Sequence, residues 1–311
     1  MYRLAVFVVV VTAIASLMMG SGPSAQNTPS LLPGPNLTKA DYDDVLINPN
    51  DEARFQRFLD KLPQLTLDGR TDYLIEGDLR LTRQDVRRNL LKYLQSQNQT
   101  RETARARQVG SSSDELYVMT DANERPAKWS LQERALTYAV HRNSFSHPDA
   151  PSGLYDEVVR NMQDAAKEWV EPCDCGLSIT HRAEHDVDPS LDNVTFIVRF
   201  VPGSSGLIAL AFFPNDPKEK RYISVWKGYR TSQFDRVGVF RHELGHVMAY
   251  RHAHINGVPG CAQEADNPHW IALSPYDSKS AMHYPCGGNT SNKFMLSDRD
   301  KADHKAYYAA Q

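Results

Sequence analysis

The stretch from His242 to His252 reads HELGHVMAYRH and carries the densest chemistry of the chain. On a helix, His242 and His246 lie four residues apart, so both imidazoles project from one face and can bind a single zinc ion, with Glu243 beside them. Catalytic zinc sites use three protein ligands and leave a position for water. His252 is the natural candidate for the third ligand, provided that the helix ends first and the chain turns back. The stretch therefore predicts a zinc helix and a hydrolytic site.

This spacing follows the pattern H-E-x-x-H-x-x-G-x-x-H, which is completed downstream by a turn that contains methionine, the Met-turn. The chain supplies such a turn at Ser280–Tyr284, which reads SAMHY. The combination resembles the metzincin clan of zinc endopeptidases, and the Ser-x-Met-His-Tyr form is most similar to its astacin branch. The resemblance covers residues 130–311 and is sharp from His242 to Tyr284. It implies a zinc-dependent endopeptidase with one catalytic Zn²⁺ and with proteins or peptides as substrates.

The resemblance also implies roles for single residues of the site. The three histidines would bind zinc, and Glu243 would take a proton from water and pass it to the leaving amine. Tyr284 resembles the astacin tyrosine that binds zinc through its phenol and then stabilises the oxyanion; the alternative is an aromatic side chain packed beside the turn. Met282 would form an apolar floor beneath the imidazoles. For His283 we expect a structural or surface role.

One position departs from the family, which has glycine where this chain has Ala249. Glycine there lets the backbone leave the helix with positive φ, and a residue with a Cβ in that conformation costs about 1 to 2 kcal/mol. Metal binding offsets such a cost, because zinc contributes about 10 kcal/mol or more in small sites. The departure keeps His254 open as a competitor of His252 for the third ligand position.

Composition excludes some classes of function. The chain has 311 residues and a net charge of −3, so no basic excess points to nucleic acid. Arg3 precedes an almost wholly apolar run from Leu4 to Met19 that is followed by small residues, which predicts a secretory signal. We therefore expect a secreted protein, extracellular or periplasmic, without stable membrane association. An uncleaved anchor is the alternative, because the run is just short of a full span.

We predict three parts in the chain: a signal peptide at 1–25, a prosegment and linker with two helices at 26–127, and a catalytic domain at 128–311. The polar segment from Gln95 to Ser113, rich in arginine and serine, predicts an exposed junction where a protease could separate the last two parts.

The prosegment shows a helical pattern twice. Residues 26 to about 50 are rich in Pro, Asn and Ser and predict extended linker. Apolar residues at helical spacing predict one helix at Glu52–Leu62 and a second after Thr82. Thr82 and Asp85 form the capping-box pattern that starts a helix.

Between these helices, the stretch from Ile75 to Asp78 resembles the astacin prosegment motif F-x-G-D, with Ile75 where the family has Phe. In the family, the aspartate takes the position of the water on zinc. The resemblance thus implies that Asp78 keeps the enzyme latent and that the prosegment inhibits its own catalytic domain. The alternative is an ordinary turn, because Gly-Asp pairs are common in loops.

The order of helical and strand patterns in residues 128–311 predicts an α+β fold. Its order of elements resembles the metzincin fold: a twisted, mostly parallel sheet with an edge strand, the zinc helix and a Met-turn subdomain. The matrixin branch has a stretch similar to Leu207–Phe213, which implies the edge strand along which substrate is laid; the alternative is an ordinary core strand. The other strands are predicted at Leu136–Val140, Val194–Phe200 and Tyr222–Trp226. Helices are predicted at Leu154–Trp169, at Gln233–Ala249 and from Leu296–Asp300 to Tyr308.

Four cysteines fit an oxidising compartment. Cys261 and Cys286 bracket the segment between the zinc helix and the Met-turn, so we favour a disulfide between them. Cys173 and Cys175 could be free, linked to each other or mixed with the others. A further metal site could draw on this Cys-x-Cys pair, or on His181, His185, Asp186 and Asp188.

Two other classes of function remain as alternatives. The first is a zinc-binding protein that keeps the fold without turnover, against which the intact Glu243 argues, because zinc binding alone needs no base there. The second is a membrane-tethered protein whose N-terminal helices serve as an interaction module, which N-terminal sequencing of the exported product would test.

Overall fold

A computed structural model describes residues 37, 39–75, 79–91, 94, 116–120, 125–203, 207–254, 258, 261, 270–289 and 291–309. Three predicted features lie outside these residues: the signal peptide at 1–25, Asp78 and the junction at Gln95–Ser113. Within the described part of the chain, no helix has both the length and the apolar character needed to cross a membrane.

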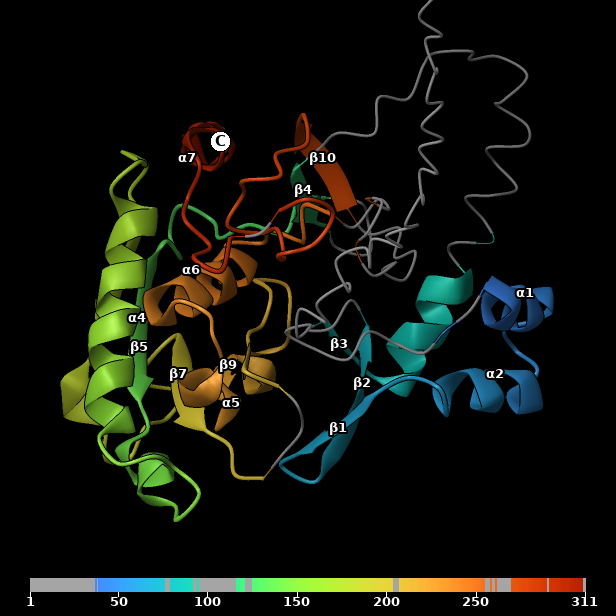
Figure 1. The fold of residues 1–311 in the computed structure, drawn as a ribbon, viewed down its shortest axis with the longest axis horizontal. Coiled ribbons are helices and arrows are strands. Elements are labelled where there is room, and N and C mark those ends of the chain that lie inside the picture. Colours follow the sequence, from blue (N-terminus) through green and yellow to red (C-terminus); the bar gives the residue numbers. More distant parts are fainter. Residues whose placement is uncertain are drawn as a thin grey trace, which may run out of the picture.

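A five-stranded sheet forms the centre of the larger part of the molecule (Figure 1). Its strands run in the order β6-β5-β7-β9-β8; the first four are parallel, and β8 pairs with β9 in the antiparallel sense. This confirms the predicted α+β class with a mostly parallel sheet. The bounds are β5 Ala135–Val140, β6 Ser178–His181, β7 Phe196–Phe200, β8 Ala209–Leu210 and β9 Tyr222–Val225.

The stretch predicted as a strand at Leu207–Phe213 is a strand only at Ala209–Leu210, and it lies at the edge of the sheet. The predicted strands at β5, β7 and β9 are present within two residues of their expected bounds. We did not predict β6, at the opposite edge, whose four residues carry no clear alternation of polar and apolar side chains.

Two helices, α4 (Leu154–Val170) and α6 (Arg236–Val247), pack against each other beside the sheet (Figure 1). Arg241 joins them, because its guanidinium binds the Glu168 carboxylate through two contacts of 2.7 Å. The Trp169 indole N–H adds a bond of 2.8 Å to the Arg241 carbonyl. The zinc-helix candidate α6 is thus held by the long helix before it.

Local backbone and side-chain hydrogen bonds determine where α6 begins and where it ends. The predicted start at Gln233 is too early, because the Asp235 side chain caps the helix by accepting the Gly238 N–H at 2.6 Å. At the other end, Ala249 has a φ of +80°. The Ala249 N–H donates to the His246 carbonyl and the Tyr250 N–H to the Gly245 carbonyl, at 2.8 and 2.9 Å. This pair of bonds is the Schellman motif, which ends a helix and reverses the chain.

The N-terminal unit, residues 39–91, has its own hydrophobic cluster and lies to one side of the central sheet (Figure 1). Its helices are α1 (Lys39–Ile47), α2 (Glu52–Leu59) and a helical segment at 83–91. The prediction of extended chain up to about residue 50 is wrong, because α1 forms there and buries Val45 completely in this cluster. The predicted capping box is present: the Asp85 N–H donates to Thr82 Oγ1 at 3.1 Å, and the Thr82 N–H donates to the Asp85 carboxylate at 3.3 Å.

A three-stranded antiparallel sheet in the N-terminal unit was not predicted. It consists of β1 (Gln64–Leu67), β2 (Arg70–Ile75) and β3 (Leu79–Leu81). Asp68 and Gly69, both with positive φ, form the turn between β1 and β2. An Asp-Gly pair between two short strands is a strong hairpin signal, and it was present in the sequence.

A second small sheet borders the end of α6. Here β4 (Leu116–Met119) pairs with β10 (Trp270–Ser274) in the antiparallel sense. On its other side, the Met119 N–H donates to the Ala249 carbonyl, and the Arg251 N–H donates to the Tyr117 carbonyl. Strand β4 therefore holds the chain where it leaves the helix, although it precedes the predicted domain boundary near Lys128, which stays a prediction.

The conformation of Ala249 leads to a prediction about stability. Ala249→Gly relieves about 1 to 2 kcal/mol of backbone strain but loses a buried methyl group worth about 0.8 kcal/mol and adds chain entropy to the unfolded state. We therefore expect Ala249→Gly to change the free energy of unfolding by less than about 1 kcal/mol. Ala249→Val should lower it by more than about 2 kcal/mol, because a β-branched residue has no low-energy conformer at this φ and the site is fully buried. Chemical denaturation of both variants checks this, and equal stability of Ala249→Val and the parent would contradict it.

Candidate metal centre

Three buried histidines converge at the end of α6. His242 and His246 project from one face of the helix, and His252 approaches after the chain reverses. The Nε2 atom of His242 lies 3.2 Å from that of His252 and 3.3 Å from that of His246. The exposed fraction is 2 % or less for each side chain. The structure thus brings together the three residues that the sequence proposes as metal ligands.

Backbone carbonyls orient two of the rings. The Nδ1–H of His242 donates to the Ala281 carbonyl at 2.8 Å, and the Nδ1–H of His246 donates to the Tyr250 carbonyl at 2.7 Å. A neutral imidazole that donates through Nδ1 has a lone pair on Nε2. The short contact between the two Nε2 atoms therefore joins two acceptors, an arrangement that a cation between them stabilises.

The spacing of these nitrogens can be compared with zinc chemistry. Zinc binds histidine at about 2.0 to 2.1 Å, and tetrahedral angles then place two ligand nitrogens about 3.3 Å apart. The observed separations of 3.2 and 3.3 Å agree with this value. Three neutral imidazoles are also a donor set that suits zinc. The residues present therefore fit a single zinc ion.

His254, the competing candidate for the third ligand, does not belong to the group that contains His242 and His246. Its ring stacks on that of His252 with the centroids 5.1 Å apart, and its ligand atom groups with those of His283 and Cys286 instead of His242 and His246. Among the described residues, the group that contains the two helix histidines is completed by His252.

The second group, of His254, His283 and Cys286, has a different explanation. Cys286 forms a disulfide with Cys261, the pairing that we favour from the sequence, so its sulfur is not a thiolate. His283 accepts the Tyr276 hydroxyl at Nε2 at 2.5 Å and donates from Nδ1 to the Tyr284 carbonyl at 2.6 Å. Both nitrogens of His283 are therefore engaged, and we interpret this group as a hydrogen-bonded cluster that supports Tyr284.

The two proposed catalytic side chains lie beside the histidines. Glu243 follows His242 on α6 and is 5 % exposed. The Tyr284 ring packs against His252, with the centroids 4.3 Å apart, and against His242 at 5.2 Å. The ring contacts place Tyr284 at the centre, Glu243 is placed by its position next to His242 on the helix, and the roles of both residues stay proposals.

The Ser280–Tyr284 turn contacts the site at two further points. A Cβ added at Gly245 would lie 2.2 Å from Met282 Sδ, so the Met282 side chain packs directly on the helix between His242 and His246. The Met282 carbonyl accepts the Ala253 N–H at 2.9 Å, which holds the segment just after His252. Gly245 is thus part of the site, because it leaves room for Met282. This role depends on a contact with a distant turn, so the sequence around Gly245 does not indicate it.

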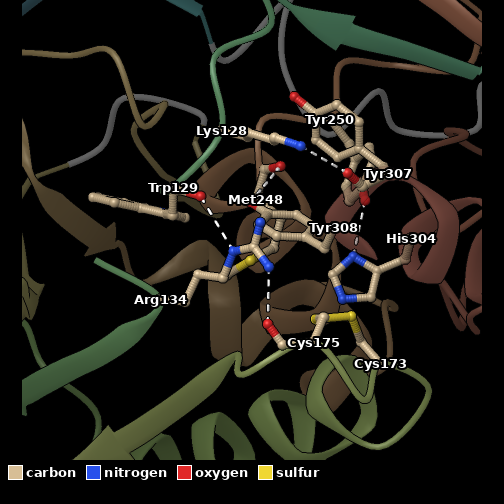
Figure 2. Close-up of a disulfide and its surroundings, with 10 residues drawn as sticks. All are labelled: Lys128, Trp129, Arg134, Cys173, Cys175, Met248, Tyr250, His304, Tyr307 and Tyr308. Atoms are coloured by element: carbon tan, nitrogen blue, oxygen red, sulfur yellow. Dashed lines mark hydrogen bonds between the residues drawn. A yellow bond between two sulfur atoms is a disulfide. The ribbon is translucent and has the colours of Figure 1, made fainter. Parts of the chain in front are cut away.

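The C-terminal helix α7 (Asp298–Ala309) supplies His304, Tyr307 and Tyr308, which lie near Met248 and Tyr250 at the end of α6 (Figure 2). The Tyr308 hydroxyl donates to the Met248 carbonyl at 3.2 Å, and the Tyr250 hydroxyl lies 2.8 Å from His304 Nδ1. Trp169 of α4 stacks on Tyr250 with the rings nearly parallel. Tyr250, whose carbonyl holds His246, is therefore fixed on two sides.

The remaining sequence candidates do not form a second metal site. Cys173 and Cys175 are joined to each other by a disulfide, and Arg134 donates to the Cys175 carbonyl at 2.8 Å (Figure 2). His181 Nε2 lies 3.0 Å from both oxygens of Asp186 in an ordinary hydrogen-bonded pair. Within the described ranges, no group able to hold a metal includes His181, His185, Asp186 or Asp188.

The likenesses to known proteins that we describe here are distant. No family model matches the chain, and no curated protein matches its sequence. Among solved structures, high choriolytic enzyme 1, a hatching enzyme zinc-protease from the medaka fish Oryzias latipes, aligns at 14 % identity with a TM-score of 0.34, over 66 % of this chain and 100 % of its own. A structure of a chaperone–substrate complex aligns at 13 % identity and a TM-score of 0.30, over 57 % and 35 %. Likenesses this distant identify no family, so we infer the function from the residues of the site.

The buried His304 predicts a pH dependence of stability. Burial lowers the pKa of His304 to about 4, whereas an unfolded histidine titrates near 6.5. The unfolded state therefore binds the extra proton between these values, and stability falls as pH decreases through this window. We expect the chain to lose about 2 kcal/mol more than a His304→Gln variant between pH 7 and pH 5. Denaturation at both pH values, with a chelator present to remove metal effects, measures this difference. Equal losses of stability in the parent and in His304→Gln would contradict the assignment of this pH dependence to His304.

Proposed function

We propose that this chain is a zinc-dependent endopeptidase of the metzincin type, which hydrolyses peptide bonds in proteins or peptides. The observation that carries the proposal is the convergence of three histidine Nε2 atoms at 3.2 and 3.3 Å, with two of the rings oriented by carbonyls. Three such residues would hold one zinc ion and would leave a coordination position for water, as catalytic zinc sites require.

The chemistry divides between the ion and the chain. When bound, zinc lowers the pKa of water towards about 7 and polarises the scissile carbonyl. Glu243, next to His242 on the helix, takes a proton from the attacking water and transfers it to the leaving nitrogen. The Tyr284 phenol, whose ring packs against His252, donates a hydrogen bond to the oxyanion that develops on the carbonyl.

Strand β8 is the proposed binding edge for substrate. It is the last strand of the sheet, and its pairing among the described strands is with β9 alone. An extended peptide could add to its other edge by main-chain hydrogen bonds, with alternate side chains entering pockets. Shortly after β8, the Phe213 ring lies 5.2 Å from the ring of His246, so a peptide along this edge would run towards the metal centre.

Latency is the second element of the proposal, with the N-terminal unit as an inhibitor in cis. Strand β3 begins directly after Asp78, and Leu81 at its end packs against the cluster that contains Phe213 and Ala249. Phe213 and Ala249 border the proposed metal centre, because Phe213 contacts His246 and Ala249 ends the zinc helix. The position of β3 supports a role for Asp78 as the carboxylate that takes the place of water.

Charged contacts anchor this unit to the larger part. The guanidinium of Arg80 is buried and donates to the Lys220 carbonyl at 2.8 Å, while Lys220 Nζ lies 3.6 Å from the buried Asp72 carboxylate. At the tip of the β1–β2 hairpin, Asp68 pairs with Arg199 at 2.9 Å. The buried Lys220–Asp72 pair favours one docked arrangement over others.

Export is the third element. Two disulfides fit an oxidising compartment, and the apolar run at Leu4–Met19 supports a signal for secretion. We therefore propose a secreted enzyme made as a latent precursor.

The test of the hydrolytic function is Glu243→Gln. We expect the parent chain, freed of its N-terminal unit and loaded with zinc, to cleave unfolded casein, and a chelator to stop the reaction. Glu243→Gln should retain a single zinc ion and lose about 10²-fold or more in turnover, because the proton acceptor is gone. Glu171→Gln, at a surface helix end, is the matched control and should cleave normally. Zinc binding without turnover in the parent would favour the alternative of a non-catalytic metal protein.

The test of latency is Asp78→Ala in the uncut chain. If the carboxylate occupies the position of water, its removal should raise casein cleavage by about tenfold or more over the uncut parent, or speed the removal of the N-terminal unit. Asp60→Ala, at an exposed position of the same unit, should leave the latency unchanged. Equal latency of Asp78→Ala and the parent would count against this role.

A further inference from the structure

We infer that Asp300 is a positioning residue for the metal ligands His242 and His252, and that it acts through the Ser280–Tyr284 turn. The inference rests on the proposed function, because it assumes that these histidines bind the metal. It assigns a role to a buried carboxylate that lies far from them in sequence and touches neither.

Asp300 is almost fully buried, at 3 % exposure, and its carboxylate is directed at the turn. One oxygen accepts the Ser280 hydroxyl at 2.7 Å, and the other accepts the Ala281 N–H at 2.8 Å. Burial raises the pKa of this carboxyl, and the same hydrogen bonds act against that rise. A carboxylate at this depth costs several kcal/mol unless donors surround it. The donors that it gathers are those of the turn and of its own helix cap.

The bonds continue from the turn to the first ligand. Ala281, whose N–H is bound by Asp300, presents its carbonyl to the Nδ1–H of His242 at 2.8 Å. The Ser280 hydroxyl, bound by the same carboxylate, accepts the Met282 N–H at 3.0 Å. Three consecutive residues of the turn are therefore fixed, directly or through one hydroxyl, by one side chain of α7.

The same turn reaches the third ligand. The Met282 carbonyl accepts the Ala253 N–H, directly after His252. A shift of the turn would therefore move the carbonyl that orients the His242 ring and the one that holds the chain beside His252. Groups that orient metal-bound histidines are worth about 10- to 100-fold in metal affinity. Asp300 acts one step further out, on the backbone that supplies those groups.

A purely local role for Asp300 has to be separated from this one. Asp300 also forms a capping box with Ser297 at the start of α7: the Ser297 N–H donates to its carboxylate, and the Asp300 N–H donates to Ser297 Oγ, both at 3.0 Å. If capping were its whole contribution, loss of either partner would destabilise the helix equally and leave the metal site unchanged. Ser297→Ala removes the hydroxyl of the box without touching the turn and is the matched control.

The experiment compares zinc affinity in the full chain, measured by competition with a chromophoric chelator. Asp300→Asn keeps the size of the side chain but replaces one acceptor oxygen by a donor, so it cannot accept from both Ser280 and Ala281. We expect its zinc affinity to fall by about tenfold or more. Ser297→Ala should lower the free energy of unfolding by about 1 kcal/mol with the zinc affinity within about threefold of the parent. The visible spectrum of the cobalt-substituted chain, which reports ligand geometry, should change in Asp300→Asn alone.

The outcomes separate this inference from the proposed function. Tight zinc binding and an unchanged cobalt spectrum in folded Asp300→Asn would overturn the inference and leave the peptidase proposal intact. Failure of the parent chain to bind zinc would overturn both. If Asp300→Asn does not fold, Ser280→Ala removes the hydroxyl that links the carboxylate to the turn; we expect it to weaken zinc binding by at least about threefold, and an unchanged affinity would overturn the inference.

Discussion

Two hydrogen bonds, from the Nδ1–H groups of His242 and His246 to the carbonyls of Ala281 and Tyr250, decide what the centre of this molecule can do. They select the tautomer in which both Nε2 atoms carry lone pairs, and they aim those lone pairs at one point. Without them, each ring could turn about its side-chain torsions and present either nitrogen. The elements around the centre position these two carbonyls within hydrogen-bonding distance of the two rings.

The two carbonyls are reached by different routes. The position of Tyr250 is set by the chain reversal at Ala249. There the backbone adopts a left-handed conformation, leaves the helix and forms hydrogen bonds with β4. Ala281 belongs to a turn 39 residues after His242, in which Met282 packs against Gly245. One carbonyl is thus set by local backbone geometry and the other by tertiary packing. A substitution can therefore displace either carbonyl without altering any of the three imidazoles.

Much of the larger part could be predicted from the sequence, because its signals are local. The spacing of His242 and His246 needs only a helix, and the cap at Thr82 and Asp85 needs only four residues. Contacts between distant segments gave no such signal. The pairing of β4 with β10 joins residues about 150 positions apart, and the carbonyl of Ala281 is a backbone group that every residue type carries. The hairpin at Asp68-Gly69 is a different case, because its turn signal is local and the sequence carries it.

Strand β4 has a consequence for the maturation of a precursor. It lies upstream of most of the part that carries the candidate metal centre, yet it forms hydrogen bonds with Ala249 and Arg251 and also pairs with β10. If the proposed precursor is cut, residues 116–119 must therefore remain with the part that carries the candidate metal centre. Trimming of a new N-terminus past Leu116 would remove residues of this strand, and with them the backbone hydrogen bonds that hold the chain where α6 ends.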